Sequence, residues 1–331
     1  ITITTSDDQV TFSGSSSTIN SEGSETNDLT LSLGTGTAQF NGIIGGTRTL
    51  GAISITGALD LNAAITNASS LSVSTTSDLG ANVTTSGTQT YTGAVTLSAA
   101  TTLTTTNSDI TFSSTVNADT AGRALTISQG TGDTTFTGAV GATTALGNMT
   151  ITTDTLSAAA IKLQGTLNIT NSGTSSITGI ISDGATAAIL TKAGAGTLTL
   201  SGANTYTGST SINAGTLAAT VNNALGTSAA GTTIASGATL DLQNVTYSTT
   251  EALTVNGGTI KTSTGTSSFA GAISLTANST IDVSGTQLTL SGIISSTSTY
   301  SVTKSSSGTL ILSGANTYTG ATTISAGVLR A

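Results

Sequence analysis

Residues 192–218 read KAGAGTLTLSGANTYTGSTSINAGTLA, and residues 304–330 read KSSSGTLILSGANTYTGATTISAGVLR, an offset of 112 positions (304 − 192). The octet SGANTYTG at 201–208 is identical at 313–320, and a degenerate copy, SGTQTYTG, opens residues 86–103. An internal repeat determines architecture before any single residue does, because every copy has to fold in the same way. The fold of the repeated stretch therefore predicts the fold of the chain.

The repeat is predicted to form short β-strands joined by tight turns. Residues 197–201 (TLTLS) alternate polar and apolar side chains, which is the period of a half-buried strand. Gly202 and Asn204 form a predicted turn in which Asn204 bonds its own backbone, and the alternation resumes over 205–213 and 216–218. Strands this short cannot close a core alone, so successive coils must stack and bury rows of Leu and Ile, as in a β-solenoid. At about 20 residues per coil, the offset between the copies corresponds to about five coils.

Composition supports an all-β chain. The 331 residues include 40 Gly and no Pro, Cys, Trp or His, with 36% hydrophobic and only 7% charged residues. Thr, Val and Ile suit a pleated sheet, and the absence of Pro fits a stack in which nearly every strand N–H bonds the next coil. We find no linker or break in composition, so residues 1–331 are predicted to be a single continuous β-solenoid with degenerate coils. Residues 13–28 are the most polar segment, and an insertion loop is expected there.

Charge and residue types exclude several classes of function. The net charge is −8 with no cluster of Lys or Arg, which disfavours nucleic acid as a partner. No apolar run is long enough for a transmembrane helix. Without His or Cys the chain cannot form a Ser-His-Asp triad, a Cys-His pair or a typical zinc site. The carboxylates are dispersed, and Glu22, Glu25 and Asp28 match no calcium-loop pattern. We therefore assign no catalytic, cofactor or metal residue and predict that the chain is not an enzyme.

The residues singled out are those that recur in both copies of the repeat. Lys192 and Lys304 occupy equivalent places, which indicates a structural role such as bonding a turn carbonyl. An aromatic-x-Gly pattern recurs along the chain, and its glycine either leaves room for a ring or marks a bend at a corner of the coil. The structural repeat positions are Lys192, Gly202, Asn204, Tyr206, Gly208, Lys304, Gly314, Asn316, Tyr318 and Gly320.

These blocks, with the GII lead-ins at 179–181 and 292–294, resemble the autotransporter-associated β-strand repeat, also called the passenger-associated transport repeat. The resemblance implies a single-stranded right-handed parallel β-helix, exported to the outer surface of a Gram-negative-type bacterium or released from it. In that family the repeat aids secretion and folding of an adhesin-like passenger. Residue 1 is Ile and no signal peptide is visible, so the chain is expected to be a processed protein or an excised passenger fragment. No translocator segment follows the second copy, which argues against self-transport by this chain.

Three functions are compatible with this sequence. The first is a structural or adhesive surface rod that binds host surface or matrix glycans and associates end to end into a filament through uncapped terminal coils. The second is a polysaccharide-cleaving β-helix, which would need two carboxylates at one height. The third is an ice-binding face made of Thr-x-Thr pairs such as Thr197 and Thr199, against which the irregular coil lengths argue. The sequence favours the first of these.

Overall fold

The computed structural model describes residues 1–14 and 18–331, and its secondary structure there is β-strand, turn and loop without a helix. Accordingly, no helix capable of crossing a membrane occurs among these residues. Residues 15–17 of the expected insertion lie outside the described part of the chain, while residues 22–28 beside them form no strand. The chain divides into two compact units, residues 1–165 and 166–331, and each unit is an all-parallel β-solenoid.

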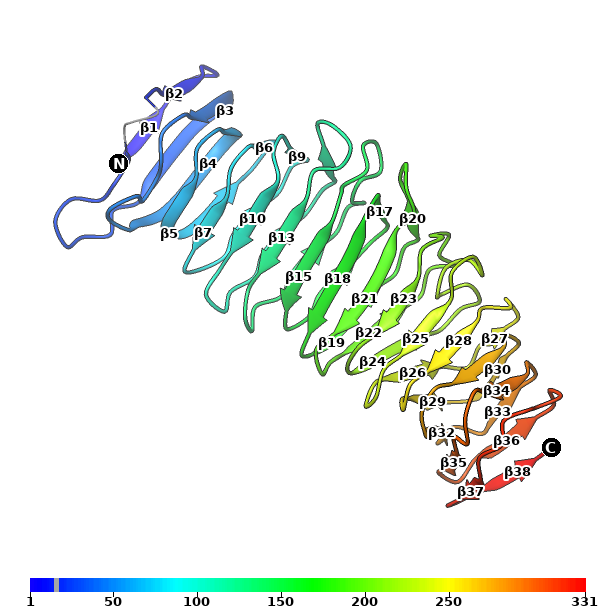
Figure 1. Ribbon diagram of the computed structural model, residues 1–331. Helices are drawn as coiled ribbons and strands as arrows, with labels where there is room; N and C mark the ends of the chain where they lie inside the picture. The colour runs from blue at the N-terminus through cyan, green and yellow to red at the C-terminus, as the bar shows by residue number, and fades with distance from the viewer. Residues whose placement is uncertain (15–17) are drawn as a thin grey trace. The chain divides into compact units, whose positions relative to one another are not determined.

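Three columns of strands form unit 1, and we call them faces A, B and C (Figure 1). Face A contains β1 (Thr2–Thr4), the first parts of β3 (Leu29–Phe40) and β4 (Leu50–Leu61), the end of β5 (Ile65–Val73), β8 (Gln89–Tyr91), β11 (Ile110–Phe112), β14 (Thr134–Phe136) and β16 (Leu156–Ala158). Face B contains β2 (Val10–Phe12), the second parts of β3 and β4, β6 (Ser77–Leu79), β9 (Val95–Leu97), β12 (Val116–Ala118) and β17 (Ile161–Leu163). Face C contains the start of β5, β7 (Val83–Thr85), β10 (Thr101–Thr104), β13 (Leu125–Ser128) and β15 (Met149–Thr153).

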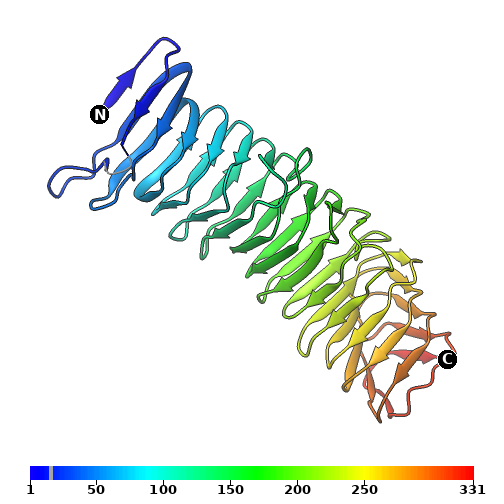
Figure 2. The ribbon, with the colours of Figure 1, turned by 45° about the horizontal axis from the view of Figure 1, so that its top comes forward.

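The alternation in sequence decides which side chains enter the core of unit 1. In β8, β9, β11 and β12 the outer two of three residues are buried and the middle one is partly exposed. In-register pairing then places each buried residue on its counterpart in the next coil, so that Tyr91, Phe112 and Phe136 form one stack of rings. Their centroids are 5.1 Å and 4.8 Å apart, and the stacked coils are visible in Figure 2.

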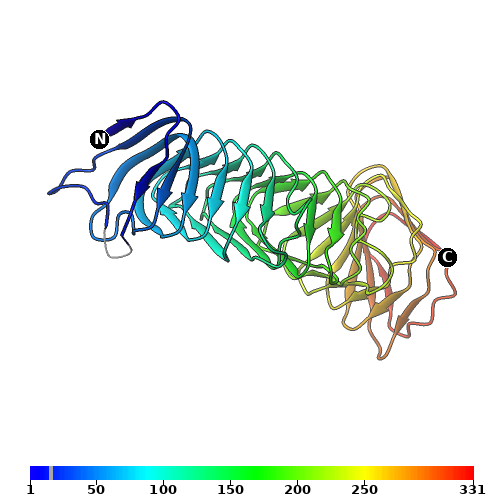
Figure 3. The same ribbon diagram turned by 90° about the horizontal axis from the view of Figure 1, so that it is seen from above.

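Unit 2 has the same construction, with three columns that we call faces D, E and F (Figure 3). Face D contains β18 (Thr166–Asn171), β21 (Ile189–Ala193), β23 (Thr210–Ile212), β25 (Thr232–Ile234), β28 (Leu253–Val255), β31 (Ile273–Leu275) and β34 (Ile294–Ser296). Face E contains β19 (Thr174–Ile177), β22 (Thr197–Leu200), β24 (Thr216–Ala219), β26 (Thr239–Leu242), β29 (Thr259–Thr262), β32 (Ser279–Val283), β35 (Val302–Ser305) and β37 (Thr322–Ile324). Face F contains β20 (Ile181–Asp183), β27 (Thr246–Tyr247), β30 (Thr266–Phe269), β33 (Gln287–Leu290), β36 (Thr309–Leu312) and β38 (Val328–Arg330).

The two copies of the repeat lie on different faces of unit 2. Face D pairs residues 190, 210, 232, 253, 273 and 294 in succession, so five coils span 104 residues (294 − 190). The offset of 112 residues is therefore five coils and eight residues, and those eight residues advance the chain by one face. The first copy begins on β21 of face D and continues on β22 of face E, whereas the second begins on β35 of face E and continues on β36 of face F. The expected offset of about five coils was therefore too small by the eight residues that advance the chain by one face.

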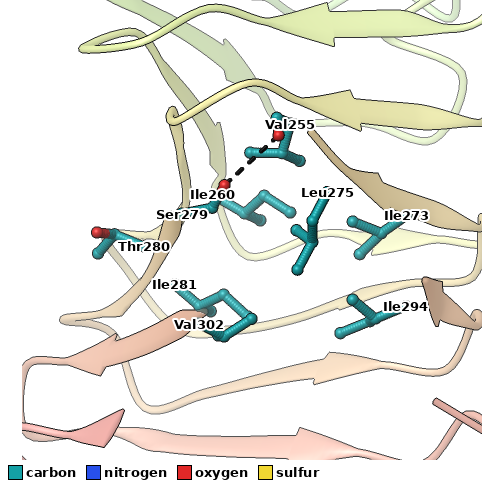
Figure 4. A pocket seen from close by; sticks show the side chains of 9 residues that line it. All are labelled: Val255, Ile260, Ile273, Leu275, Ser279, Thr280, Ile281, Ile294 and Val302. Carbon is teal, nitrogen blue, oxygen red and sulfur yellow. Dashed lines mark hydrogen bonds between the residues drawn. The ribbon is translucent and has the colours of Figure 1, made fainter. Parts of the chain in front are cut away.

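The interior between faces D and E is aliphatic (Figure 4). Val255, Ile273 and Leu275 of face D meet Ile260 and Ile281 of face E around a small apolar pocket. Ser279 and Thr280 are the polar residues that line the pocket, and the Ser279 hydroxyl donates to the carbonyl oxygen of Val255 over 3.5 Å.

Candidate functional site

Lys192 lies inside the solenoid, in an otherwise aliphatic column. It is fully buried in β21, with Ile169 as its register partner on one side and Ile212 on the other. The alternation that turns Leu190 inward also turns Lys192 inward, because the two residues are two positions apart. Its Nζ donates to the carbonyl oxygens of Ala193 (2.7 Å), Gly194 (2.9 Å) and Ala214 (3.3 Å).

Lys304 has the same environment in the second copy. It is fully buried in β35 between Ile281 and Ile324. Its Nζ donates to the carbonyl oxygens of Ser305 (2.7 Å), Ser306 (2.6 Å) and Ala326 (3.1 Å). In each copy the ammonium group therefore bonds two carbonyls of the turn that follows it and one carbonyl of the next coil. We call each arrangement a lysine cage.

The turn after each lysine directs the carbonyls toward the ammonium group. The second residue after the lysine is left-handed in both copies, with φ of 75° at Gly194 and 65° at Ser306. Burial lowers the pKa of Lys192 to about 8, because an apolar interior disfavours the charged form. Burial also lowers the pKa of Lys304, and the negative charge of Asp282 opposes that change. The carbonyls favour the ammonium form, so the cage of Lys192 holds a cation at neutral pH.

Asn204 links three coils rather than closing a turn. It is buried, its Oδ1 accepts from the backbone N–H of Ile181 (2.7 Å), and its Nδ2 donates to the carbonyl oxygen of Ala224 (2.6 Å). The expectation that Asn204 bonds its own backbone was wrong, because face F has no strand at residues 203–207 and the amide takes the place of ladder bonds. Asn316 repeats half of this arrangement, accepting from the N–H of Ile294 (2.8 Å).

Tyr206 and Tyr318 each bond a threonine four residues later. The Tyr206 hydroxyl shares a hydrogen bond with Thr210 Oγ1 (2.6 Å), and Tyr318 does so with Thr322 Oγ1 (2.7 Å). Tyr206 is fully buried, and this burial raises its pKa. Its ring occupies the space where a Cβ on Gly226 would lie, because that Cβ would come closer than 3.0 Å to the ring. No residue of the second octet, 313–320, is buried, so the same bond is exposed there.

The repeated glycines permit close contact between backbones of adjacent coils. A Cβ at Gly202 would lie closer than 3.0 Å to the carbonyl oxygen of Gly179, and one at Gly314 equally close to that of Gly292. The GII lead-in and the SGAN turn are therefore stacked in both copies. The aromatic-x-Gly pattern had two interpretations. The first, that the glycine leaves room for a ring from an adjacent coil, is wrong at Gly208 and Gly320, because the atoms nearest to an added Cβ are the carbonyl oxygens of Ala188 and Tyr300.

Other glycines of the pattern meet the same kind of obstacle. At Gly93 and Gly138 the nearest atoms are likewise backbone atoms of the preceding coil, at Thr75 and Ser114. At Gly271 the nearest atom is the carbonyl oxygen of Glu251, but a Cβ there would also come closer than 3.0 Å to the ring of Phe269, so at this position the glycine leaves room for a ring of its own coil as well. The glycine follows the end of a strand at each place, so the interpretation as a bend at a corner agrees with the contacts.

Glu251 is a buried carboxyl that the repeat pattern did not identify. It is 1% exposed, and its Oε1 accepts from Thr232 Oγ1 (2.9 Å), while Oε2 has no hydrogen-bond partner among the described residues. Burial raises its pKa from 4.5 to about 7. The sequence signal was its parity, because Glu251 lies two residues before Leu253 and four before Val255, both of which point inward.

The outer surface of face B carries a pair of carboxylates that the register brings together. Asp60 and Asp78 are partners on adjacent coils, beside a groove that Thr37, Thr76 and Thr96 also line. Asp60 accepts a hydrogen bond from Gln39 Nε2 (2.7 Å), and Asp78 accepts one from the Ser98 hydroxyl. Among residues 1–14 and 18–331, no group of three potential metal-binding side chains is found.

Comparison with known proteins identifies the repeat. The model of the passenger-associated-transport-repeat matches residues 190–219 and residues 302–331. Each match contains one lysine cage and one SGANTYTG octet. No curated protein and no solved structure matches the chain.

Proposed function

We propose, from the two passenger-associated transport repeats that the chain carries, that it is a β-solenoid passenger of an autotransporter-like secretion system, displayed on a bacterial surface or released from it. The observation that supports this most directly is where the side chains of the repeat point. Lys192, Asn204, Gly202 and Gly208 all contact backbone of a neighbouring turn or coil. Residues used in this way assist coil-by-coil folding and leave the outer surface to other side chains.

The role of the passenger is structural and adhesive, without catalysis. The interior around Val255 and Ile281 is apolar, the charged lysines are enclosed, and the exterior is rich in Thr and Ser with a net charge of −8. A surface of this kind suits contact with glycans of a host surface or matrix, because its hydroxyl groups both donate and accept hydrogen bonds.

The test is made in the bacterium that produces the protein. Intact cells are labelled with antibodies to the chain and treated with protease, and the culture medium is probed in parallel. We expect the chain on the cell surface or in the medium, and adhesion to immobilised glycans that a deletion strain has lost. A chain confined to the cytosol would contradict export, and equal adhesion by both strains would contradict the adhesive role.

A second candidate function rests on the pair Asp60 and Asp78. Adjacent strands are about 4.8 Å apart, close to the separation of about 5 Å between the two carboxyl groups of retaining glycosidases. The measurement is release of reducing ends from a panel of polysaccharides by the full chain and by Asp60→Asn and Asp78→Asn variants. Turnover that both substitutions abolish would replace the non-catalytic assignment.

A further inference from the structure

Two rows of hydroxyl groups run along the outer side of face A. The first row has one Ser or Thr in every coil, each in register with the next: Thr2, Thr30, Ser54, Ser72, Thr90, Thr111, Thr135 and Ser157. The second row lies two residues further along each coil: Thr4, Ser32, Thr56, Ser74, Thr92, Ser113 and Thr137. Backbone hydrogen bonds between coils continue through the second row, from the N–H of Thr92 to Val73 and from that of Thr137 to Phe112.

The rows remain in register although the coils differ in length. Successive members of the first row are separated by as few as 18 residues (Ser54 to Ser72) and as many as 28 (Thr2 to Thr30). Loops away from face A absorb these differences, so coil length does not disturb the row. The argument from irregular coil lengths against a regular array is therefore wrong for this face.

A stack of rings holds face A rigid from beneath. Tyr91, Phe112 and Phe136 point inward between the two hydroxyl rows, and their planes are inclined by only 10° and 2° to one another. These small angles keep three successive coils nearly parallel. Neighbouring hydroxyls are then about 4.8 Å apart along a row, and the rows are about 6.6 Å apart.

The hydroxyl groups of the rows are available to an external ligand. Among the described residues only Ser74 of the two rows uses its side chain in a hydrogen bond, accepting from the N–H of Gly57 (3.2 Å). Neither row contains a charged or aromatic residue. The carboxylates at the margin of the face are occupied, because Asp109 accepts from the N–H of Asp133, and Asp133 from that of Thr155.

We propose that face A binds the surface of ice. Water oxygens on a prism face of ice repeat on a rectangular grid similar to that of the two hydroxyl rows, so the hydroxyls can occupy lattice positions over many coils at once. Threonine methyl groups beside them exclude loosely held water. Because the hydroxyl array is ordered and stiff before binding, little conformational entropy is lost when it binds ice. A soluble glycan, whose hydroxyl groups are not arranged on such a grid, would match only a short part of it.

Ice-affinity partitioning and ice recrystallisation inhibition test this proposal on the full chain. We expect the intact chain to enter a slowly growing ice phase, and Thr111→Lys to reduce that partitioning on the order of tenfold, because the new side chain stands above the centre of the array. The matched control is Thr96→Lys on face B, a threonine of similar exposure whose register partners, Asp78 and Asn117, form no row of hydroxyl groups. It should partition as the intact chain does.

Three results would overturn the assignment: exclusion of the intact chain from ice, equal loss with both substitutions, or an effect of Thr111→Lys on binding to crystalline polysaccharide with none on ice. Far-UV circular dichroism and thermal melting of each variant establish that the comparison is between folded chains. Export and adhesion are measured separately, so failure of the proposed passenger role leaves this test intact.

Discussion

Substitution of Glu251 by Gln should remove a pH dependence of stability that the structure assigns to this one carboxyl. Burial raises the pKa of Glu251 from 4.5 to about 7. The folded chain therefore keeps this proton up to about pH 7, whereas the unfolded chain releases it near pH 4.5. Between these values the folded state binds more protons, so the stability contribution is fully present below pH 4.5 and is lost as pH rises to about 7.

The magnitude follows from the difference between the two pKa values. Each tenfold change in proton affinity corresponds to about 1.4 kcal/mol, so the full loss is about 3 kcal/mol. The glutamine of the variant cannot titrate, and its amide oxygen can still accept from the hydroxyl of Thr232, as Glu251 Oε1 does. Tyr206 and Tyr247 also act on Glu251, but burial raises the pKa of both phenols, so they do not titrate in this window. We expect the intact chain and Glu251→Gln to differ little at about pH 4.5, and the variant to be more stable at about pH 8.

Amide hydrogen exchange is the appropriate assay, because a solenoid can open locally without unfolding as a whole. Protection of residues 232–255 is measured at several pH values after correction for the intrinsic exchange rate. The control is Glu22→Gln, which alters an exposed glutamate. Parallel loss of protection with rising pH in the intact chain and in Glu251→Gln would refute the reasoning, as would a matching effect of the control.

Three further substitutions test the repeat itself, each by denaturant unfolding monitored by circular dichroism. Lys192→Met should lower the free energy of unfolding by about 2 kcal/mol, because three buried carbonyls lose their donor, and an unchanged midpoint would contradict the cage. Asn204→Ala should cost about 2–4 kcal/mol, whereas Asn316→Ala in the second octet, where no residue is buried, should cost less than about 1 kcal/mol, and equal effects would contradict the bridging role. Ser306→Gly should raise stability by about 1 kcal/mol by relieving a left-handed conformation, and a loss of stability would show that no strain exists there.

Much of the fold followed from local alternation, because a strand has only two sides. The inward row of Leu190 and Lys192, and that of Leu253 and Val255, could be predicted without coordinates. The same parity predicts that Glu251 points inward. Parity alone could not predict the surroundings of the Glu251 carboxyl group. The hydrogen bond from the Thr232 hydroxyl to Oε1, and the burial of Oε2 without a partner among the described residues, arise only when the coils stack.

Features that depend on the path between strands were not predictable from local pattern. Asn204 bonds Ile181 and Ala224, which lie about one coil before and after it, and no local turn rule contains those partners. The hydroxyl rows of face A depend on coil lengths between 18 and 28 residues that nonetheless return each strand to the same register. The number of residues per coil predicted irregular hydroxyl rows, because a residue count alone does not separate loop residues from strand residues.

The placement of the two repeats distinguishes what the repeat does from what a binding surface does. A surface that contacts an extended ligand must keep its residues on one face, as the hydroxyl rows of face A do. The two repeats do not, because the first spans faces D and E while the second spans faces E and F. Yet both retain the lysine cage, whose bonds reach only the following turn and the next coil. A repeat that keeps the same contacts on different faces of the solenoid depends only on the coils next to it. The contacts of the repeat therefore fix how one coil is laid on its neighbour, whichever face of the solenoid the repeat occupies.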